Sequence, residues 1–287
     1  MTGPSKRSGP KLDNVLIATD FSAASKTALA CGTAVARRHR SKLFVVHVSS
    51  TQAKAKVMDA WRALQSEVTD LLVAGRLAGV DHKLLVKSGA VGEALSQVVA
   101  EHKIDLVVLG SSGRTGLWKF FLGSASETIM QHVSCPVLTV GPNSLGTNSE
   151  SGPRRILVPT GFAPQSLYAV AYGSWLAEQL QSSLALVHVA VNAASPQDVE
   201  RVKRERLERL REIASKEQHG RGKAELMVEF GSVTERILDA AARWKAELIV
   251  LGVHSVESDL HGETTWSKAM DIMRRAPCPV LTVPMPK

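Results

Sequence analysis

Asn14-Val-Leu-Ile-Ala-Thr-Asp-Phe-Ser22 aligns with Arg155-Ile-Leu-Val-Pro-Thr-Gly-Phe-Ala163 in the second half of the chain. The match continues without a gap as far as Leu43-Phe-Val-Val-His-Val-Ser49 and Leu184-Ala-Leu-Val-His-Val-Ala190. Each piece contains a short run rich in Val, Leu or Ile that ends in small or polar residues, which is typical of a buried strand followed by a loop. A pattern that recurs with the same internal spacing indicates two copies of one structural unit.

The repeat extends to the end of both halves. Val86-Lys-Ser-Gly-Ala-Val-Gly92 corresponds to Val228-Glu-Phe-Gly-Ser-Val-Thr234, and both halves close with Cys-Pro-Val-Leu-Thr-Val, beginning at Cys135 and at Cys278. The chain therefore contains two domains of ordinary size. We expect a disordered leader over residues 1–12, domains over residues 13–141 and 154–287, and a linker rich in Gly, Ser, Asn and Pro over residues 142–153.

Each half alternates short apolar runs with longer segments of helical period, the pattern of a parallel sheet covered by helices on both faces. The predicted fold class is α/β, with two tandem, open, five-stranded parallel sheets, doubly wound in a Rossmann-like or adenine nucleotide α-hydrolase-like order. In the first half we expect strands at Asn14–Ala18, Lys42–Val48, Asp81–Lys87, Leu106–Leu109 and Val137–Val140. We expect helices at Ser22–His39, Gln52–Leu77, Val91–Glu101 and Ser124–Gln131.

The composition excludes several classes of protein. Apolar residues make up 44% and charged residues 22% of the chain, as in ordinary soluble domains. No apolar run approaches the roughly 20 residues of a membrane-spanning helix, and the leader lacks the apolar stretch of a signal peptide, so we expect a cytoplasmic protein without a membrane partner. Three cysteines without CxxC spacing argue against a disulfide framework or a zinc site. The net charge of +8 is not accompanied by interleaved aromatic residues, so nucleic-acid binding is not expected.

The most specific chemical feature is Gly110-Ser-Ser-Gly113, followed after nine residues by Gly123-Ser124. The first glycine pair follows an expected strand, and the second opens an expected helix. Glycine lets a ligand approach the backbone, and the free amides at a helix N-terminus attract phosphate. In a doubly wound sheet the ligand lies where the winding direction reverses. If the first strand neighbours the fourth, that crevice is bounded by residues 19–22 and 110–113.

This pattern resembles the universal stress protein family, whose ATP-binding members carry G-x2-G-x9-G-[S/T] at this place. The resemblance covers nearly the whole chain, twice. It implies that the backbone near Val48 holds adenine and that Asp20 and Gly110 hold adenosine. It also implies that the phosphates lie among Gly113, Gly123, Ser124 and Ala125. For Lys119, between the glycine pairs, we favour a solvated loop lysine over a point charge that reaches the phosphates. Thr19 and Leu109 complete the expected nucleotide site. The expected ligands are ATP and Mg²⁺, the metal held chiefly through the phosphates.

Other interpretations of this site remain open. The glycines are also compatible with structural turns, with Asp20 as the N-cap of the following helix. We find no Walker lysine, paired carboxylates or convergent triad, so an enzyme is less expected than a binding protein, with slow ATP hydrolysis at most. His47 and His188 occupy matching strand positions, which favours a packed or hydrogen-bonded role. The alternatives are a weak ATP-cleaving enzyme of the same fold group and a scaffold without ligand.

The second half has lost the site residues. Asp20 is replaced by Gly161, Gly113 by Ser255 and Gly123 by Trp266, whereas Gly252 and Ser267 survive. A Trp side chain fills the space where backbone would approach phosphate, so we expect ATP in the first half only. The polar loop with His254, Asp259 and His261 is interpreted as solvated and not as a metal site.

The last strand of each half, Val137–Val140 and Val280–Val283, is apolar and otherwise unpaired. Unpaired strand edges tend to be covered or joined, so we expect the halves to form an internal pseudo-dimer through these strands. The resemblance to the universal stress protein family implies the same, because single-domain members of that family pair through this strand. A further homodimer is left open, as is the identity of a regulatory protein partner.

Overall fold

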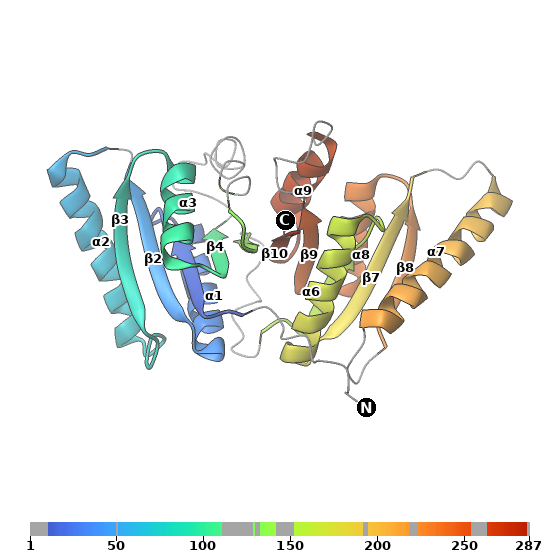
Figure 1. Cartoon of the computed structure of the whole chain (residues 1–287), viewed down its shortest axis with the longest axis horizontal. Coiled ribbons are helices and arrows are strands. Elements are labelled where there is room, and N and C mark those ends of the chain that lie inside the picture. The colour runs from blue at the N-terminus through green and yellow to red at the C-terminus, as the bar shows by residue number, and fades with distance from the viewer. Residues whose placement is uncertain are drawn as a thin grey trace, which may run out of the picture.

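The computed structural model describes residues 11–49, 51–110, 129, 133–141, 152–191, 195–217, 223–253 and 263–285. Its two halves lie side by side, with one helix, α2 or α7, at each outer end (Figure 1). The first half contains β1 (Asn14–Ala18), α1 (Ala23–His39), β2 (Lys42–Ser49), α2 (Lys54–Val73), β3 (His82–Ser88), α3 (Val91–His102), β4 (Leu106–Gly110) and β5 (Val137–Val140). The second contains β6 (Arg155–Pro159), α6 (Pro164–Leu180), β7 (Ser183–Ala190), α7 (Pro196–Glu217), β8 (Glu225–Phe230), α8 (Val233–Trp244), β9 (Leu248–Val253), α9 (Glu263–Arg275) and β10 (Val280–Pro284).

All strands belong to one sheet in the order β3-β2-β1-β4-β5-β10-β9-β6-β7-β8. Within each half the strands are parallel, as expected, and β1 neighbours β4. β5 and β10 pair antiparallel, with Leu138 opposite Leu281 and Val137 opposite Thr282. The expected junction between the last strands is therefore present, and it makes one ten-stranded sheet of the two five-stranded ones.

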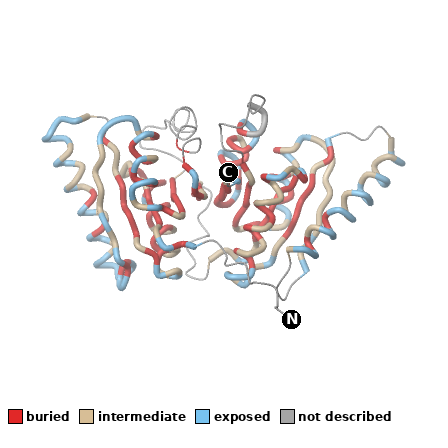
Figure 2. The backbone as a smooth tube through the Cα atoms, viewed as in Figure 1, coloured by how far each residue is buried: buried red, intermediate tan, exposed pale blue. Residues whose placement is uncertain are grey.

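The strands form because their side chains are buried on both faces. Val15, Leu16 and Ile17 are fully buried, with Leu16 in the core of one face and its two neighbours in the core of the other. One core packs under α3, α8 and α9, and the opposite core packs under α1, α2, α6 and α7. Each core contains residues from both halves, so the hydrophobic interior is continuous across the junction. In Figure 2 the buried residues, in red, follow the central strands of both halves.

α1 and α6 approach the sheet at matching glycines. A Cβ atom built on Gly32 would lie 2.6 Å from Ile17 Cδ1, and one on Gly173 would lie 2.6 Å from Val158 Cγ2. These distances are far shorter than a van der Waals contact, so a larger residue would push the helix away from the sheet. The same packing solution therefore occurs in both copies of the repeat.

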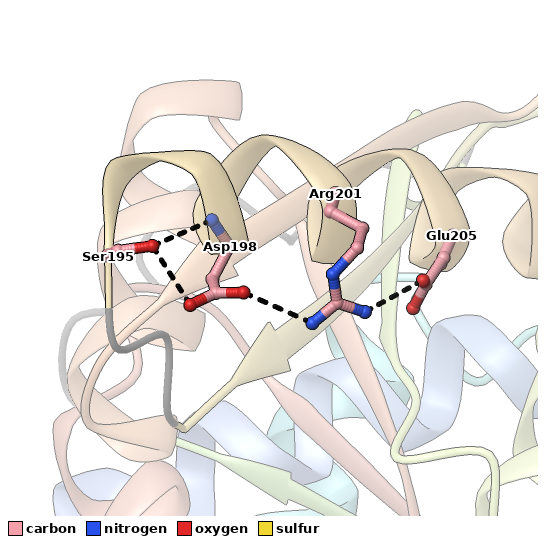
Figure 3. Close-up of polar contacts among 4 residues, drawn as sticks. All are labelled: Ser195, Asp198, Arg201 and Glu205. Carbon is pink, nitrogen blue, oxygen red and sulfur yellow. Dashed lines mark hydrogen bonds and ion pairs between the residues drawn. The ribbon is translucent and has the colours of Figure 1, made fainter.

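A side-chain cap fixes the start of α7 (Figure 3). Ser195 Oγ accepts a hydrogen bond from the backbone N–H of Asp198 (3.2 Å) and donates one to Asp198 Oδ2 (2.9 Å). Arg201 then pairs with Asp198 (3.3 Å) and with Glu205 (2.9 Å) along the exposed face of the helix. The cap satisfies an amide that the helix itself leaves without a partner.

The helix expected at Ser124–Gln131 lies outside the described residues except for Ile129, and most other element ends agree with the sequence-based expectations within two residues. Two differences are larger. α2 ends at Val73, four residues before the expected end at Leu77, because the chain turns there and Gly75 adopts a φ of +69°. Leu77 is nonetheless buried, and that explains why the apolar pattern continues past the helix. Leu12, the last residue of the expected leader, is also buried, and its carbonyl accepts a hydrogen bond from Ser41 Oγ.

None of the helices in the described part of the chain combines the length and the apolar character that a bilayer crossing requires.

Candidate functional site

A crevice of about 60 Å³ opens in the first half at the carboxyl ends of β1 and β4. Five of the residues predicted to bind nucleotide line it together: Thr19, Asp20, Val48, Leu109 and Gly110. The remaining predicted site residues, Gly113, Gly123, Ser124 and Ala125, lie outside the described residues, as does Lys119. The structure therefore describes one part of the candidate site, the part at the ends of β1, β2 and β4.

The crevice wall also contains residues that sequence analysis did not single out: Ala18, Ser25, Val46, Val91, Leu95 and Ile129. Val46 and Val48 lie two residues apart on β2, so their side chains point to the same face of the sheet. That alternation would have identified Val46 as the companion of Val48. The wall is mostly apolar, with Asp20 as the single carboxylate among its lining residues, which suits a flat base next to a hydroxylated group.

The loop after β1 is held by its own hydrogen bonds. Asp20 Oδ1 accepts the N–H of Ser22 at 3.0 Å, and Ser22 Oγ accepts the N–H of Ser25 at 3.2 Å. The N-cap of α1 is therefore Ser22, and the alternative that assigns this role to Asp20 is wrong. Asp20 shapes the loop from outside the helix while lining the crevice.

A histidine from the neighbouring strand braces this loop in both halves. His47 Nδ1 lies 2.9 Å from the carbonyl oxygen of Thr19, and the ring stacks on Phe21 with centroids 4.5 Å apart. His188 repeats the arrangement with Thr160 (2.8 Å) and Phe162 (4.3 Å). Because the half that has lost Asp20 keeps this contact unchanged, we interpret these histidines as supports of the loop.

Glu67 on α2 reaches the same loop from the side. Its Oε2 accepts a hydrogen bond from Thr19 Oγ1 at 3.1 Å, and its Oε1 is buried without a hydrogen-bond partner. Burial raises the pKa of Glu67, and the Thr19 hydrogen bond and the charge of Lys26 oppose that rise. Helical spacing places Glu67 on the face of the buried Leu64 and Val68, so the sequence indicates a residue turned toward the interior, but it does not indicate the contact with this loop.

Gly110 is required by packing as well as by any ligand. A Cβ atom at Gly110 would lie 2.5 Å from the carbonyl carbon of Ala24 and 2.7 Å from the nitrogen of Ser25. At the matching Gly252 it would lie 2.1 Å from the carbonyl oxygen of Gln165. The first turn of α1 or α6 thus presses on the end of the strand in each half. The survival of Gly252 follows from this packing and does not indicate a second ligand site.

The second half carries different residues at the positions that match this site. Gly161, which replaces Asp20, has open space around its Cα position and carries no carboxylate. Trp266, which replaces Gly123, is only 7% exposed and packs into the apolar core in the first turns of α9. The expectation that Trp266 fills a phosphate site stays a prediction, since the matching Gly123 lies outside the described residues. Ser255, His254, Asp259 and His261 lie outside the described residues.

Comparison with known proteins gives consistent matches. A family model described as "Universal stress protein family" matches residues 11–141 and 152–284. A putative universal stress protein of Staphylococcus aureus (strain USA300) is 32% identical over 142 residues, which cover 46% of this chain and 86% of that protein. A crystal structure of a universal stress protein from Archaeoglobus fulgidus DSM 4304 is similar with a TM-score of 0.72 at 18% identity, over 95% of this chain and 98% of the other. A putative universal stress protein from Pseudomonas aeruginosa UCBPP-PA14 gives a TM-score of 0.66 at 14% identity, over 95% and 93%. These two solved structures establish the fold alone.

Proposed function

This chain belongs to the universal stress protein family as a tandem of two family domains, and from that premise we propose that it is an ATP-binding regulatory protein of the stress response. In this proposal the nucleotide is held in the first half only, in the cytoplasm, and its presence changes the contacts of the chain with a protein partner. The second half serves as a structural counterpart that has given up the ligand.

The observation that carries the proposal is the convergence of Thr19, Asp20, Val48, Leu109 and Gly110 on one crevice. These residues come from three different strands or the loops after them, and they meet at the carboxyl ends of neighbouring parallel strands, where nucleotides bind in doubly wound sheets. The described residues fit the adenosine end of ATP. Val46 and Val48 offer an apolar surface to the base, and the carboxylate of Asp20 can accept hydrogen bonds from ribose hydroxyls.

The phosphate end of the proposed site rests on the glycine pattern of the sequence, since Gly113, Gly123 and Ser124 lie outside the described residues. Within the residues that the structure describes, no group of three His, Cys, Asp or Glu side chains is placed to hold a metal ion. We therefore propose that Mg²⁺ enters with the nucleotide and is held chiefly by its phosphates.

We favour nucleotide binding over rapid hydrolysis because the acidic groups near the crevice are already hydrogen-bonded to the loop. Asp20 accepts a backbone N–H, and Glu67 accepts the Thr19 hydroxyl. A general base has to be within reach of the proton that it removes, and both carboxylates are already committed to holding the loop. Slow hydrolysis remains compatible with this arrangement.

Titration calorimetry of the full chain with Mg-ATP tests the proposal. We expect one site per chain. Asp20→Gly, which copies the second half into the first, should weaken binding by roughly 10-fold to 100-fold, because a charged hydrogen-bond acceptor is lost. Gly161→Asp is the matched control: the open space at Gly161 accepts the side chain, and the affinity should not change.

The alternatives give different results. Two equivalent sites per chain would contradict the assignment to the first half. The absence of binding by the wild-type chain, together with no adenine nucleotide in mass spectra of gently purified protein, would favour a scaffold without ligand.

A further inference from the structure

The loop after β6, in the second half, is contacted by two arginines of α7. The guanidinium carbon of Arg209 lies 4.4 Å from the centre of the Phe162 ring, and that of Arg206 lies 6.0 Å from it. His188 stacks on the same ring, with centroids 4.3 Å apart. Phe162 is buried, so two positive charges lie over a buried ring just beyond the carboxyl end of β6.

These two charges are not neutralised by a neighbouring side chain. Earlier on the same helix Arg201 pairs with Asp198 and Glu205, as Figure 3 shows. In the part of the chain that the structure describes, Arg206 and Arg209 pair with no carboxylate, and the buried Nε atom of Arg206 has no hydrogen-bond partner. Residues three positions apart are neighbours on a helix surface, where like charges repel. An anion between the two guanidinium groups would remove this repulsion.

The first half has the opposite charge at the matching loop. Asp20 belongs to that loop, and Glu67 of α2 accepts a hydrogen bond from the Thr19 hydroxyl. In the second half Gly161 stands in place of Asp20, and the helix that reaches the loop brings arginines instead of a glutamate. The histidine and phenylalanine that support the loop are the same in both halves. The loops therefore share one scaffold and differ in the charge that surrounds it.

The start of α6 offers room and hydrogen-bond donors beside the arginines. A Cβ atom built on Gly161 would have no atom of the described residues within 4 Å. The N-cap of α6 is Ala163, whose methyl group cannot accept a hydrogen bond, whereas Ser22 caps the Ser25 amide in α1. Amides at the start of a helix attract anions when no side chain caps them.

We propose that residues 160–163 and α7 form an anion site in the second half, where Arg206 and Arg209 bind a phosphate group next to Gly161. A phosphate group accepts hydrogen bonds from several directions and carries close to two negative charges at neutral pH. It therefore suits two guanidinium groups better than a carboxylate with a single charge does. The site does not rest on the proposed nucleotide function and stands whether or not that proposal holds.

Titration calorimetry of the full chain with inorganic phosphate, at fixed ionic strength and without nucleotide, tests the proposal. We expect saturable binding that Arg206→Gln and Arg209→Gln each weaken roughly 10-fold, because a charge-assisted hydrogen bond is lost. Arg211→Gln removes the same charge from an exposed position of α7, so it is the matched control and should change nothing. Circular dichroism checks that each variant folds.

Three results would overturn the proposal: no saturable binding by the wild-type chain, equal weakening by all three variants, or binding that Arg206→Gln and Arg209→Gln leave unchanged. The last result would place the phosphate elsewhere, including the glycine pattern of the first half.

A substitution outside α7 tests the same site. Gly161→Asp gives the loop the carboxylate that the first half has, and the open space accepts its side chain. The added negative charge should abolish phosphate binding while both arginines are still present. Phosphate binding that survives this change would contradict a site next to Gly161.

His188 reports the position of the bound anion. Burial lowers the pKa of His188, and the charges of Arg206 and Arg209 lower it further. A bound phosphate offsets those charges, so it should raise this pKa, which an NMR titration of the imidazole ring measures with and without phosphate. An unchanged pKa at saturating phosphate would rule out this location.

Two further probes define the chemistry of the ligand. Glycerol 3-phosphate and inorganic phosphate should both depend on Arg209, and the tighter of the two shows whether the phosphate is bound as an ester or as the free ion. Acetate should bind at least 10-fold more weakly than phosphate, because it has one charge and fewer acceptor directions. Acetate binding as tight as that of phosphate would overturn the assignment to a phosphate group.

Discussion

Gly110 is subject to two requirements that a paired experiment can separate. We expect Gly110→Ala and Gly252→Ala each to lower the free energy of unfolding by about 1–3 kcal/mol, because each new Cβ atom would overlap the backbone of α1 or α6. Only Gly110→Ala should also weaken the binding of ATP. Urea denaturation measures the free energy of unfolding of each variant. Gly161→Ala adds a Cβ atom in open space, so it is the control that should leave both the free energy of unfolding and the affinity for ATP unchanged. A stable Gly252→Ala variant would show that the strand end does not need glycine.

Glu67 makes stability depend on pH in an unusual direction. Its pKa in the folded chain is raised by burial above the usual value near 4.5. The folded state therefore binds the proton more tightly than the unfolded state does. The stability linked to this group is fully present below about pH 4.5 and is lost as the pH rises through the folded pKa.

We accordingly expect Glu67→Gln to gain stability relative to wild type between pH 4 and pH 7.5, by less than about 1 kcal/mol, since the Glu67 side chain is partly exposed to solvent. Chemical denaturation of both proteins at several pH values measures this difference. A difference that shrinks with rising pH would mean that Lys26 and Thr19 favour the ionised form more than burial opposes it.

The site could be predicted from the sequence only in part, for reasons visible in single residues. Asp20 and Gly110 follow strands that apolar runs identify, so topology alone places them together. Glu67 belongs to a helix whose position over the first loop depends on tertiary packing, and no local pattern gives that. The alternative with Asp20 as the cap could not be separated from Ser22 by sequence because both residue types cap helices, and the choice depends on the backbone turn at Phe21, whose φ is +64°.

At the scale of elements, the cap of α7 offers a separate test. Ser195→Ala removes the side chain that bonds the Asp198 amide, and we expect a loss of about 1 kcal/mol in stability. Hydrogen exchange of the Asp198 amide should accelerate. Ser215→Ala is the control on the same helix, because Ser215 Oγ donates only to the exposed carbonyl of Glu212. Equal losses from the two variants would show that the cap has no special role.

Element bounds were predictable where burial and local chemistry agree. β1 and β5 begin and end at the expected residues, since both are short runs of buried apolar residues between polar turns. The end of α2 was missed because Leu77 continues the apolar spacing into a turn that packs against the core. Gly75 marked the boundary, yet glycine alone does not decide between a tolerated helix position and a helix end.

At the scale of the whole molecule, the junction predicts how a separated half behaves. β5 consists of four buried residues, and its outer edge pairs with β10. A chain of residues 11–141 alone would expose that edge, and exposed apolar edges pair with another strand. We expect this half to form a homodimer, detected by light scattering after size-exclusion chromatography, while Leu138→Lys should render it monomeric. A monomeric wild-type half would mean that the helices, and not the strands, hold the two halves together.

Joining the halves in one chain also changes what a single mutation does. In a dimer of identical subunits every substitution appears twice, and a residue on the symmetry axis has to fit against its own copy. Leu138 opposite Leu281 still meets that condition. Asp20 and Gly161 are matched positions away from this axis, and they differ. The two halves are encoded separately, so the second half can carry Trp266 at the position where the first half has Gly123. Covalent linkage thereby turns a symmetric particle into one whose two faces can evolve independently.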